Sequence, residues 1–156
     1  MPSKATISDI RFHCLERNLP LKERTKLKAF LIGLFKAEKT ALDSLDYVFC
    51  SDNYLLKINK EFLHHDFYTD IISFNLSERR QGVVGEVYIS IDRVVENANG
   101  LNISIKQELH RVIFHGALHL CGYKDKSKAD ISIMRKMEDK YLSGYFRKVP
   151  RGTTQK

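Results

Sequence analysis

The sequence predicts a single domain of the α+β or mixed α/β class, in which strands and helices alternate. The chain has 156 residues, a length typical of one domain. No internal repeat, low-complexity tract or linker rich in Pro and Gly divides it. Apolar runs typical of strands are interleaved with segments whose apolar residues recur at helical spacing. We therefore expect one domain over residues 1–148 and a polar, disordered tail over 149–156.

The first half of the chain contains two expected strands and two expected helices. A strand is expected within Thr6–Leu15, and Leu45–Cys50 forms a second, short and apolar one. The first helix is expected over Leu21–Lys39, with a buried face of Leu27, Phe30, Leu31, Leu34 and Phe35. A second helix is expected over Tyr54–Phe62, after the good capping residues Ser51 and Asp52.

The second half begins with two further strands, Asp70–Phe74 and Val83–Ile91, joined by the charged turn Ser77–Gly82. Ser127 and Asp130 resemble a capping box before the last helix. Three helices are expected after these strands: Asp92–Asn99, a helix from near Ser104 to the natural stop at Gly122, and Lys128–Phe146.

The composition excludes several classes of protein. Hydrophobic residues make up 43% and charged residues 29%, as in soluble globular proteins, which excludes disordered and fibrous chains. No apolar stretch approaches the roughly 18 residues of a membrane span, and no apolar segment of a secretion signal follows Met1. Three cysteines without a CxxC pair, Cys14, Cys50 and Cys121, indicate free thiols in a reducing cytoplasm. The net charge of +7 suggests a polyanionic partner, most commonly nucleic acid.

One segment carries a specific chemical signal. His115 and His119 are four residues apart, so a helix places both imidazoles on one face, where they can bind one divalent transition metal ion together. Gly122 ends the helix, and Asp125 can return a carboxylate to the same ion. Three protein ligands and an open position are the arrangement of catalytic zinc. We expect one zinc ion, or another divalent transition metal, at these three residues.

The same segment leaves alternatives open. Its ligand spacing matches zinc peptidases, but those enzymes carry a glutamate base directly after the first histidine, where this chain has Gly116. The two histidines can also be a chance pair on a core-facing helix, and Cys121 is a buried thiol or a soft ligand. Glu108 lies two turns from His115, too far to reach a water at the site. Arg111 is a phosphate contact, a solvated arginine, or a residue paired with Glu108 or Gln107.

The segment His115–Tyr123 resembles the YbeY family, bacterial rRNA maturation factors regarded as metal-dependent endoribonucleases, whose signature is close to HGxLHLxGYDH. The resemblance extends from about Asp46 to Glu138. It implies an α+β fold with a small mixed sheet of about four strands flanked by about five helices, a zinc-like ion and action on ribosomal RNA. Three other segments resemble family elements in the same order: Ile58-Asn59 with Phe62 (LNxxY), Thr69–Phe74 (TDVLSF) and Gly85–Ser90 (GDIxIS).

Three positions depart from the family pattern. Asp125 replaces the usual third histidine, and its negative charge lowers the net charge of the site. The ion is then expected to acidify a bound water less, and a carboxylate ligand favours harder ions. Lys124 replaces an aspartate, and Leu63 stands where the family has an arginine. If that arginine matters for cleavage, a nearby cation or histidine must replace it, and the candidates are His64, His65, Arg111 and Lys124.

The resulting hypothesis is a single-strand-specific, metal-dependent endoribonuclease of rRNA maturation and ribosome quality control, which hydrolyses phosphodiesters with a metal-bound water. The general base is unknown, with Asp70, Ser73, Arg111 and Lys124 as candidates. The partners expected are single-stranded RNA, ribosomal RNA and the ribosome, without a membrane or a dinucleotide cofactor. The alternatives are a non-catalytic ribosome assembly factor with a structural metal and a zinc-dependent peptidase or amidohydrolase. Candidate RNA contacts are His64, His65, Arg79, Arg80 and Tyr123.

Overall fold

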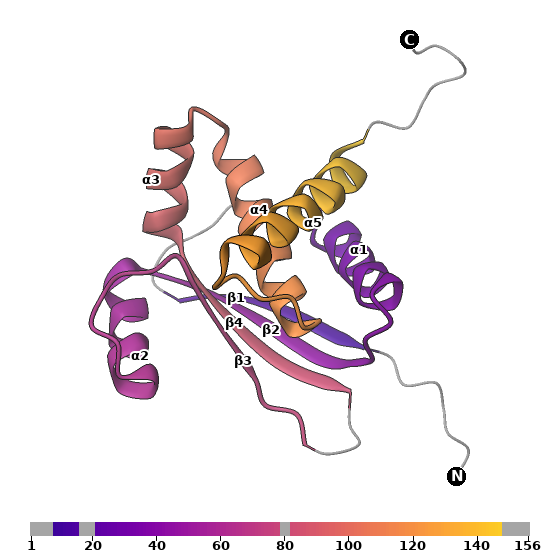
Figure 1. Cartoon of the computed structure of the whole chain (residues 1–156), viewed down its shortest axis with the longest axis horizontal. Coiled ribbons are helices and arrows are strands. Elements are labelled where there is room, and N and C mark those ends of the chain that lie inside the picture. The colour runs from indigo at the N-terminus through magenta and orange to yellow at the C-terminus, as the bar shows by residue number, and fades with distance from the viewer. Residues whose placement is uncertain (1–7, 16–20, 79–81, 148–156) are drawn as a thin grey trace.

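A four-stranded mixed sheet forms the centre of the computed structural model, which describes residues 8–15, 21–78 and 82–147. Strands β1 (Asp9–Cys14), β2 (Leu42–Cys50) and β4 (Val83–Ser90) run parallel to one another. Strand β3 (Ile71–Asn75) pairs antiparallel with β4 and forms one edge of the sheet, in the order β1-β2-β4-β3. The sheet therefore has one free edge at β1 and another at β3 (Figure 1).

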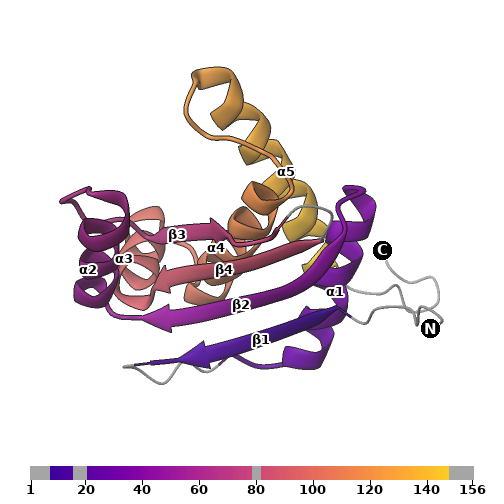
Figure 2. The same ribbon diagram turned by 90° about the horizontal axis from the view of Figure 1, so that it is seen from below.

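The described residues also form five helices. They are α1 (Arg24–Ala37), α2 (Asp52–Leu63), α3 (Ile91–Leu101), α4 (Ile105–Leu120) and α5 (Lys128–Phe146). Helices α1, α4 and α5 lie on one side of the sheet, whereas α2 lies at the end where β2 and β4 finish (Figure 1, Figure 2). Each strand and helix expected from the sequence is present, and the α+β class is confirmed. The expected tail, 149–156, and residues 79–81 of the expected turn lie outside the described residues.

Serine side chains begin four of the five helices. Each accepts a hydrogen bond of 3.0 or 3.1 Å from the backbone N–H three residues further on, which satisfies a donor that the first helical turn leaves free. The two serines expected as caps are among them. The four are Ser51, Ser90, Ser104 and Ser127.

The main core lies between the sheet and helices α1, α4 and α5. Leu45, Tyr47 and Phe49 alternate along β2, so all three point to this side and are fully buried. The expected apolar face of α1 is buried except at Phe30, which is only half-buried. Its ring lies at the margin of the core, 5.2 Å from the ring of Phe114.

A second, smaller apolar cluster fixes α2. Leu55 of α2 packs with Cys50 and Ile72, at the ends of β2 and β3. This packing leaves the C-terminal end of α2 facing α4 across strand β3, and the cleft described below lies between them. Cys14, Cys50 and Cys121 are thiols and form no disulfide with one another. Within the described ranges, no helix is both long enough and apolar enough to cross a membrane.

Candidate metal centre and cleft

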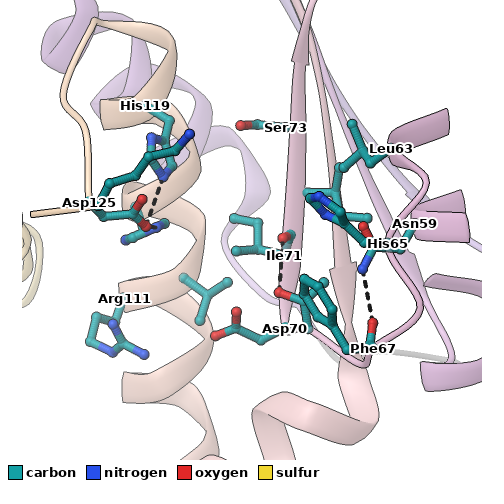
Figure 3. Close-up of a pocket in the computed structure, with 15 residues that line it drawn as sticks. Asn59, Leu63, His65, Phe67, Asp70, Ile71, Ser73, Arg111, His119 and Asp125 are labelled. Atoms are coloured by element: carbon teal, nitrogen blue, oxygen red, sulfur yellow. Dashed lines mark hydrogen bonds and ion pairs between the residues drawn. The ribbon is translucent and has the colours of Figure 1, made fainter. Parts of the chain in front are cut away.

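The last turns of α4 and the loop after them carry the predicted metal ligands. His115 and His119 lie on α4, one turn apart, with ring centroids separated by 4.6 Å. The helix ends at Leu120, and Gly122 adopts φ +105°, a conformation that L side chains rarely adopt. This turn brings the side chain of Asp125 back to the helix, beside His119 (Figure 3).

Three side-chain atoms converge at this point. The Nε2 atoms of His115 and His119 each lie 3.2 Å from the same oxygen, Oδ2 of Asp125. Two ligands of one tetrahedral zinc ion, bound at the usual distances of 2.0–2.2 Å, stand about 3.4 Å apart. The spacing of the three atoms therefore fits a single divalent ion, and this group can hold a metal ion.

A buried carboxylate that the sequence analysis missed supports His115. Glu138 on α5 accepts a hydrogen bond of 2.5 Å from Nδ1 of His115 through its Oε2 atom. Burial alone raises the pKa of Glu138, but the hydrogen bond from His115 and the charge of Arg111 outweigh burial, and the pKa is lower than usual. Glu138 is therefore a carboxylate, which can only accept, so Nδ1 carries the proton and the Nε2 lone pair faces Asp125.

Arg111 connects this carboxylate to a second one. Its Nε and Nη2 atoms donate to the two oxygens of Glu108, at 2.9 and 2.5 Å, and Nη1 donates to Oε1 of Glu138 at 3.0 Å. The hydrogen bonds to Glu108 raise the pKa of Arg111 further above its already high value. Arg111 therefore stays cationic, and its contacts favour the ion-pair interpretation over the phosphate contact and the base considered from sequence.

His119 is supported by a different chain of contacts. Its Nδ1 donates to the backbone carbonyl of Tyr123 at 2.9 Å, which again leaves Nε2 free for a metal ion. The Tyr123 hydroxyl donates to Glu38 at 2.8 Å, and the Tyr141 hydroxyl of α5 donates to the other oxygen of Glu38. The hydrogen bond to Glu38 and burial together raise the pKa of Tyr123 to about 12. The ring of Tyr123 packs against the core and is not among the residues that line the cleft.

The three candidate ligands line a cleft of about 570 Å³ between α4 and strand β3. Asp70, just before β3, points its carboxylate across the cleft toward α4 (Figure 3). Burial raises the pKa of Asp70, although the charges of His115 and Arg111 counteract part of this effect. Ser73 lines the same wall. Asp70 is thus the candidate base whose position and environment suit proton transfer.

The opposite wall of the cleft, formed by the end of α2 and the loop after it, is apolar and aromatic. Leu63 lines the cleft where the family resemblance implies an arginine. The ring of His65 stacks on Phe67 at 5.0 Å, and Nδ2 of Asn59 holds the loop by donating to the carbonyl of Phe67 at 2.9 Å (Figure 3). Lys126, beside the ligand Asp125, adds a positive charge at the cleft.

The remaining candidates lie elsewhere. His64 ends α2 with φ 58° and is exposed outside the cleft lining, and Lys124 is also exposed outside it. Arg79 and Arg80 lie outside the described residues. Glu138 had one sequence signal: it interrupts the buried stripe of α5, whose other members are Met134, Tyr141, Leu142 and Tyr145.

Gly116 has a packing role. A Cβ atom at this position would lie 2.8 Å from Cγ1 of Val87 on β4 and 3.0 Å from Cδ1 of Ile71 on β3. The backbone of Gly116 therefore packs directly against the sheet, with no space for a side chain between them. A glutamate of the zinc peptidase type has no room here.

The fold and the site together define an α+β protein with a His/His/Asp group that can hold a metal ion at the wall of a cleft. The family model described as Endoribonuclease YbeY matches residues 16–145. The chain therefore belongs to the YbeY endoribonuclease family, a family of hydrolases that act on RNA, and the resemblance inferred from sequence is confirmed.

Individual relatives agree with this assignment. The endoribonuclease YbeY of Cytophaga hutchinsonii is 48% identical over 123 residues, which cover 79% of this chain and 86% of that protein. The endoribonuclease YbeY of Flavobacterium psychrophilum is 43% identical over 127 residues, covering 81% and 90%. The solution structure of TM1509 from Thermotoga maritima is similar with a TM-score of 0.58 and 26% identity, covering 88% of this chain and 89% of that one.

Proposed function

We propose that this protein cleaves single-stranded ribosomal RNA in rRNA maturation and ribosome quality control, with a divalent ion held by His115, His119 and Asp125. The single observation that carries the proposal is the convergence of both Nε2 atoms on Asp125 at 3.2 Å, at the wall of an open cleft. When bound, zinc or another transition metal supplies Lewis acidity to a water molecule and offsets the phosphate charge. We place the activity in the cytoplasm, where free cysteines stay reduced.

The residues of the chain supply the rest of the reaction. Hydrolysis joins the oxygen of a water molecule to the phosphorus atom and breaks the bond to one ribose oxygen, so a proton must leave the water and another must reach the leaving group. Asp70 faces the ligands from the other wall, and its raised pKa suits a carboxyl group that exchanges protons. We therefore assign both transfers to Asp70, which takes a proton from the water and then gives a proton to the leaving ribose oxygen, with Ser73 as a neighbouring hydrogen-bonding group of the cleft.

The wall formed by α2 and its loop supports a single-stranded substrate. Unpaired bases stack on aromatic and histidine rings, which a base-paired strand cannot do. The stacked pair of His65 and Phe67, with Leu63 beside it, offers such a surface across the cleft from the metal ligands. Lys126 provides a cation for the phosphate backbone. In this arrangement, Leu63 contacts a base where the family arginine is expected to contact phosphate.

Leu63 is also the observation that favours a second candidate, a ribosome assembly factor without cleavage activity. An apolar side chain cannot neutralise phosphate charge, and a metal ion at the three ligands would then have a structural role only. The zinc peptidase alternative receives no such support, because Gly116 packs on Val87 and leaves no room for the base.

Cleavage assays distinguish these possibilities. Zinc-loaded and manganese-loaded protein is incubated with single-stranded RNA, with duplex RNA and with a peptide pool, and His119→Ala is compared with His13→Ala. His13 lies on β1 and pairs with Asp46, away from the cleft, so its replacement controls for the loss of an imidazole. Cleavage of single-stranded RNA by the wild type and His13→Ala, but not by His119→Ala, is expected. Equal cleavage by all three would refute the proposal, and RNA binding without cleavage would support the assembly factor.

A further inference from the structure

We propose that Glu138, oriented by Arg111, is a positioning residue that fixes the tautomer of the metal ligand His115. This inference rests on the proposed metal site. In it, Glu138 on α5 keeps the proton of His115 on Nδ1, so that Nε2 presents a lone pair to the ion.

The contacts of Glu138 leave its carboxylate a single orientation. One oxygen accepts from Nδ1 of His115 and the other accepts from Nη1 of Arg111, so both oxygens have assigned partners. Arg111 is held in turn by two hydrogen bonds to Glu108, whose side chain is fully buried. Fixed partners on both sides prevent the carboxylate from rotating away from the imidazole.

The network has no evident value for stability alone. The side chain of Glu138 is 2% exposed and that of Glu108 is 0% exposed, and buried ion pairs are often no more stable than apolar residues of the same size. Their location is more informative: Arg111 contacts Glu138, and Glu138 in turn contacts His115. The carboxylate of Glu138 places a negative charge directly behind His115, which favours a cation at Nε2; Arg111, and the more exposed Arg135 at 3.8 Å, contact its other oxygen.

The two histidines are supported unequally. His119 donates to a neutral backbone carbonyl, whereas His115 donates to a carboxylate. His115 is also the least exposed of the three ligands, at 15% against 25% for His119 and 40% for Asp125. We therefore assign the largest share of metal affinity to His115 and its support.

Glu138→Gln tests this role sharply because Arg111 can only donate hydrogen bonds. The amide must turn its carbonyl oxygen toward Arg111, which leaves its NH₂ group facing Nδ1 of His115. Nδ1 then becomes the acceptor and the proton moves to Nε2, where it blocks the metal. The matched control is Asp139→Asn, which removes the same charge from the next residue of α5 at an exposed position outside the cleft.

Two measurements on the full chain decide the question. Nitrogen-15 NMR of the metal-free protein is expected to show His115 with the proton on Nδ1 in the wild type and in Asp139→Asn, and on Nε2 in Glu138→Gln, with His119 unchanged. Competition with a chromophoric chelator is expected to show zinc binding weakened about 10–100-fold in Glu138→Gln and unchanged in Asp139→Asn.

The outcomes separate this inference from the proposed function. Wild-type protein that binds no zinc would contradict the metal site itself. Zinc binding by the wild type with equal affinity in Glu138→Gln would overturn the role of Glu138. The wild-type spectrum provides a test that needs no variant: a proton on Nε2 of His115, or a mixture of tautomers, would also overturn it, even if Glu138→Gln failed to fold.

Discussion

Replacing Gly116 by alanine is expected to give a less stable protein than the same replacement at Gly33. Both glycines lie inside helices, Gly116 in α4 and Gly33 in α1, where alanine is favoured over glycine by about 1 kcal/mol. A Cβ at Gly33 meets nothing within 4 Å, whereas a Cβ at Gly116 would lie 2.8 Å from Val87, a buried, β-branched residue in the sheet.

The magnitude follows from these contacts. Forcing one extra carbon into a packed core typically costs about 1–3 kcal/mol. Gly33→Ala should therefore raise the free energy of unfolding by about 1 kcal/mol. The free energy of unfolding of Gly116→Ala should be about 1–3 kcal/mol lower than that of Gly33→Ala. Both variants share the gain in helix propensity, so the difference reports the packing cost alone. For a chain of this size, 1 kcal/mol corresponds to about 2–4 °C in Tm, so the two Tm values should differ by about 2–12 °C.

Thermal unfolding followed by circular dichroism at one pH and one salt concentration measures the difference. Comparing two variants with the same chemical change removes the intrinsic preference of alanine for helix. A Tm for Gly116→Ala equal to or above that of Gly33→Ala would show that α4 does not approach β4 closely. The explanation given above for the missing peptidase base would then be wrong.

Three further predictions concern the site. Asp70→Asn should lower RNA cleavage about 10²–10⁴-fold as measured by initial rates. Because the pKa of Asp70 is raised in the folded state, the contribution of Asp70 to stability is greatest below the ordinary carboxyl pKa and is lost as pH rises through the raised one. This variant should therefore have a higher Tm than wild type at neutral pH and no advantage in acid. Asp125→His should keep or raise zinc-dependent cleavage, and a large loss would argue against Asp125 as a ligand. RNA binding should weaken steeply with added salt in a titration while zinc occupancy stays constant, because phosphate contacts release counterions.

The sequence predicted the elements of this fold and the three residues that converge at the candidate metal site. Apolar spacing, the serine caps and Gly122 are local signals, and His115, His119 and Asp125 lie within eleven consecutive residues, so local geometry brings them together. Glu138 could not be placed in the same way, because its contact with His115 depends on how α5 packs against α4. The role of Gly116 likewise depends on the distance between α4 and the sheet, which no sequence pattern contains.

Tyr123 illustrates the same limit from the other side. Its type and position suggested a base-stacking ring, but its hydroxyl reaches Glu38, which is distant in sequence at the end of α1. An aromatic side chain next to the candidate metal site can point into the cleft or pack against the core. Only the packing of α1 shows that Tyr123 packs against the core. Leu63, which stands where the family has an arginine, does line the cleft, as only the packing of α2 shows.

The carboxylate of Glu38 has a consequence for how the protein opens. It accepts hydrogen bonds from Tyr123, in the loop between α4 and α5 that also carries Asp125, and from Tyr141 of α5. The backbone N–H of Glu38 donates to the carbonyl of Leu34 at the end of α1. Opening the loop between α4 and α5 would therefore break hydrogen bonds that connect this loop, α1 and α5, so the loop does not open as an independent segment. The amides around Gly122 should consequently exchange with solvent through the same cooperative unfolding step as α1 and α5, although they lie in a loop.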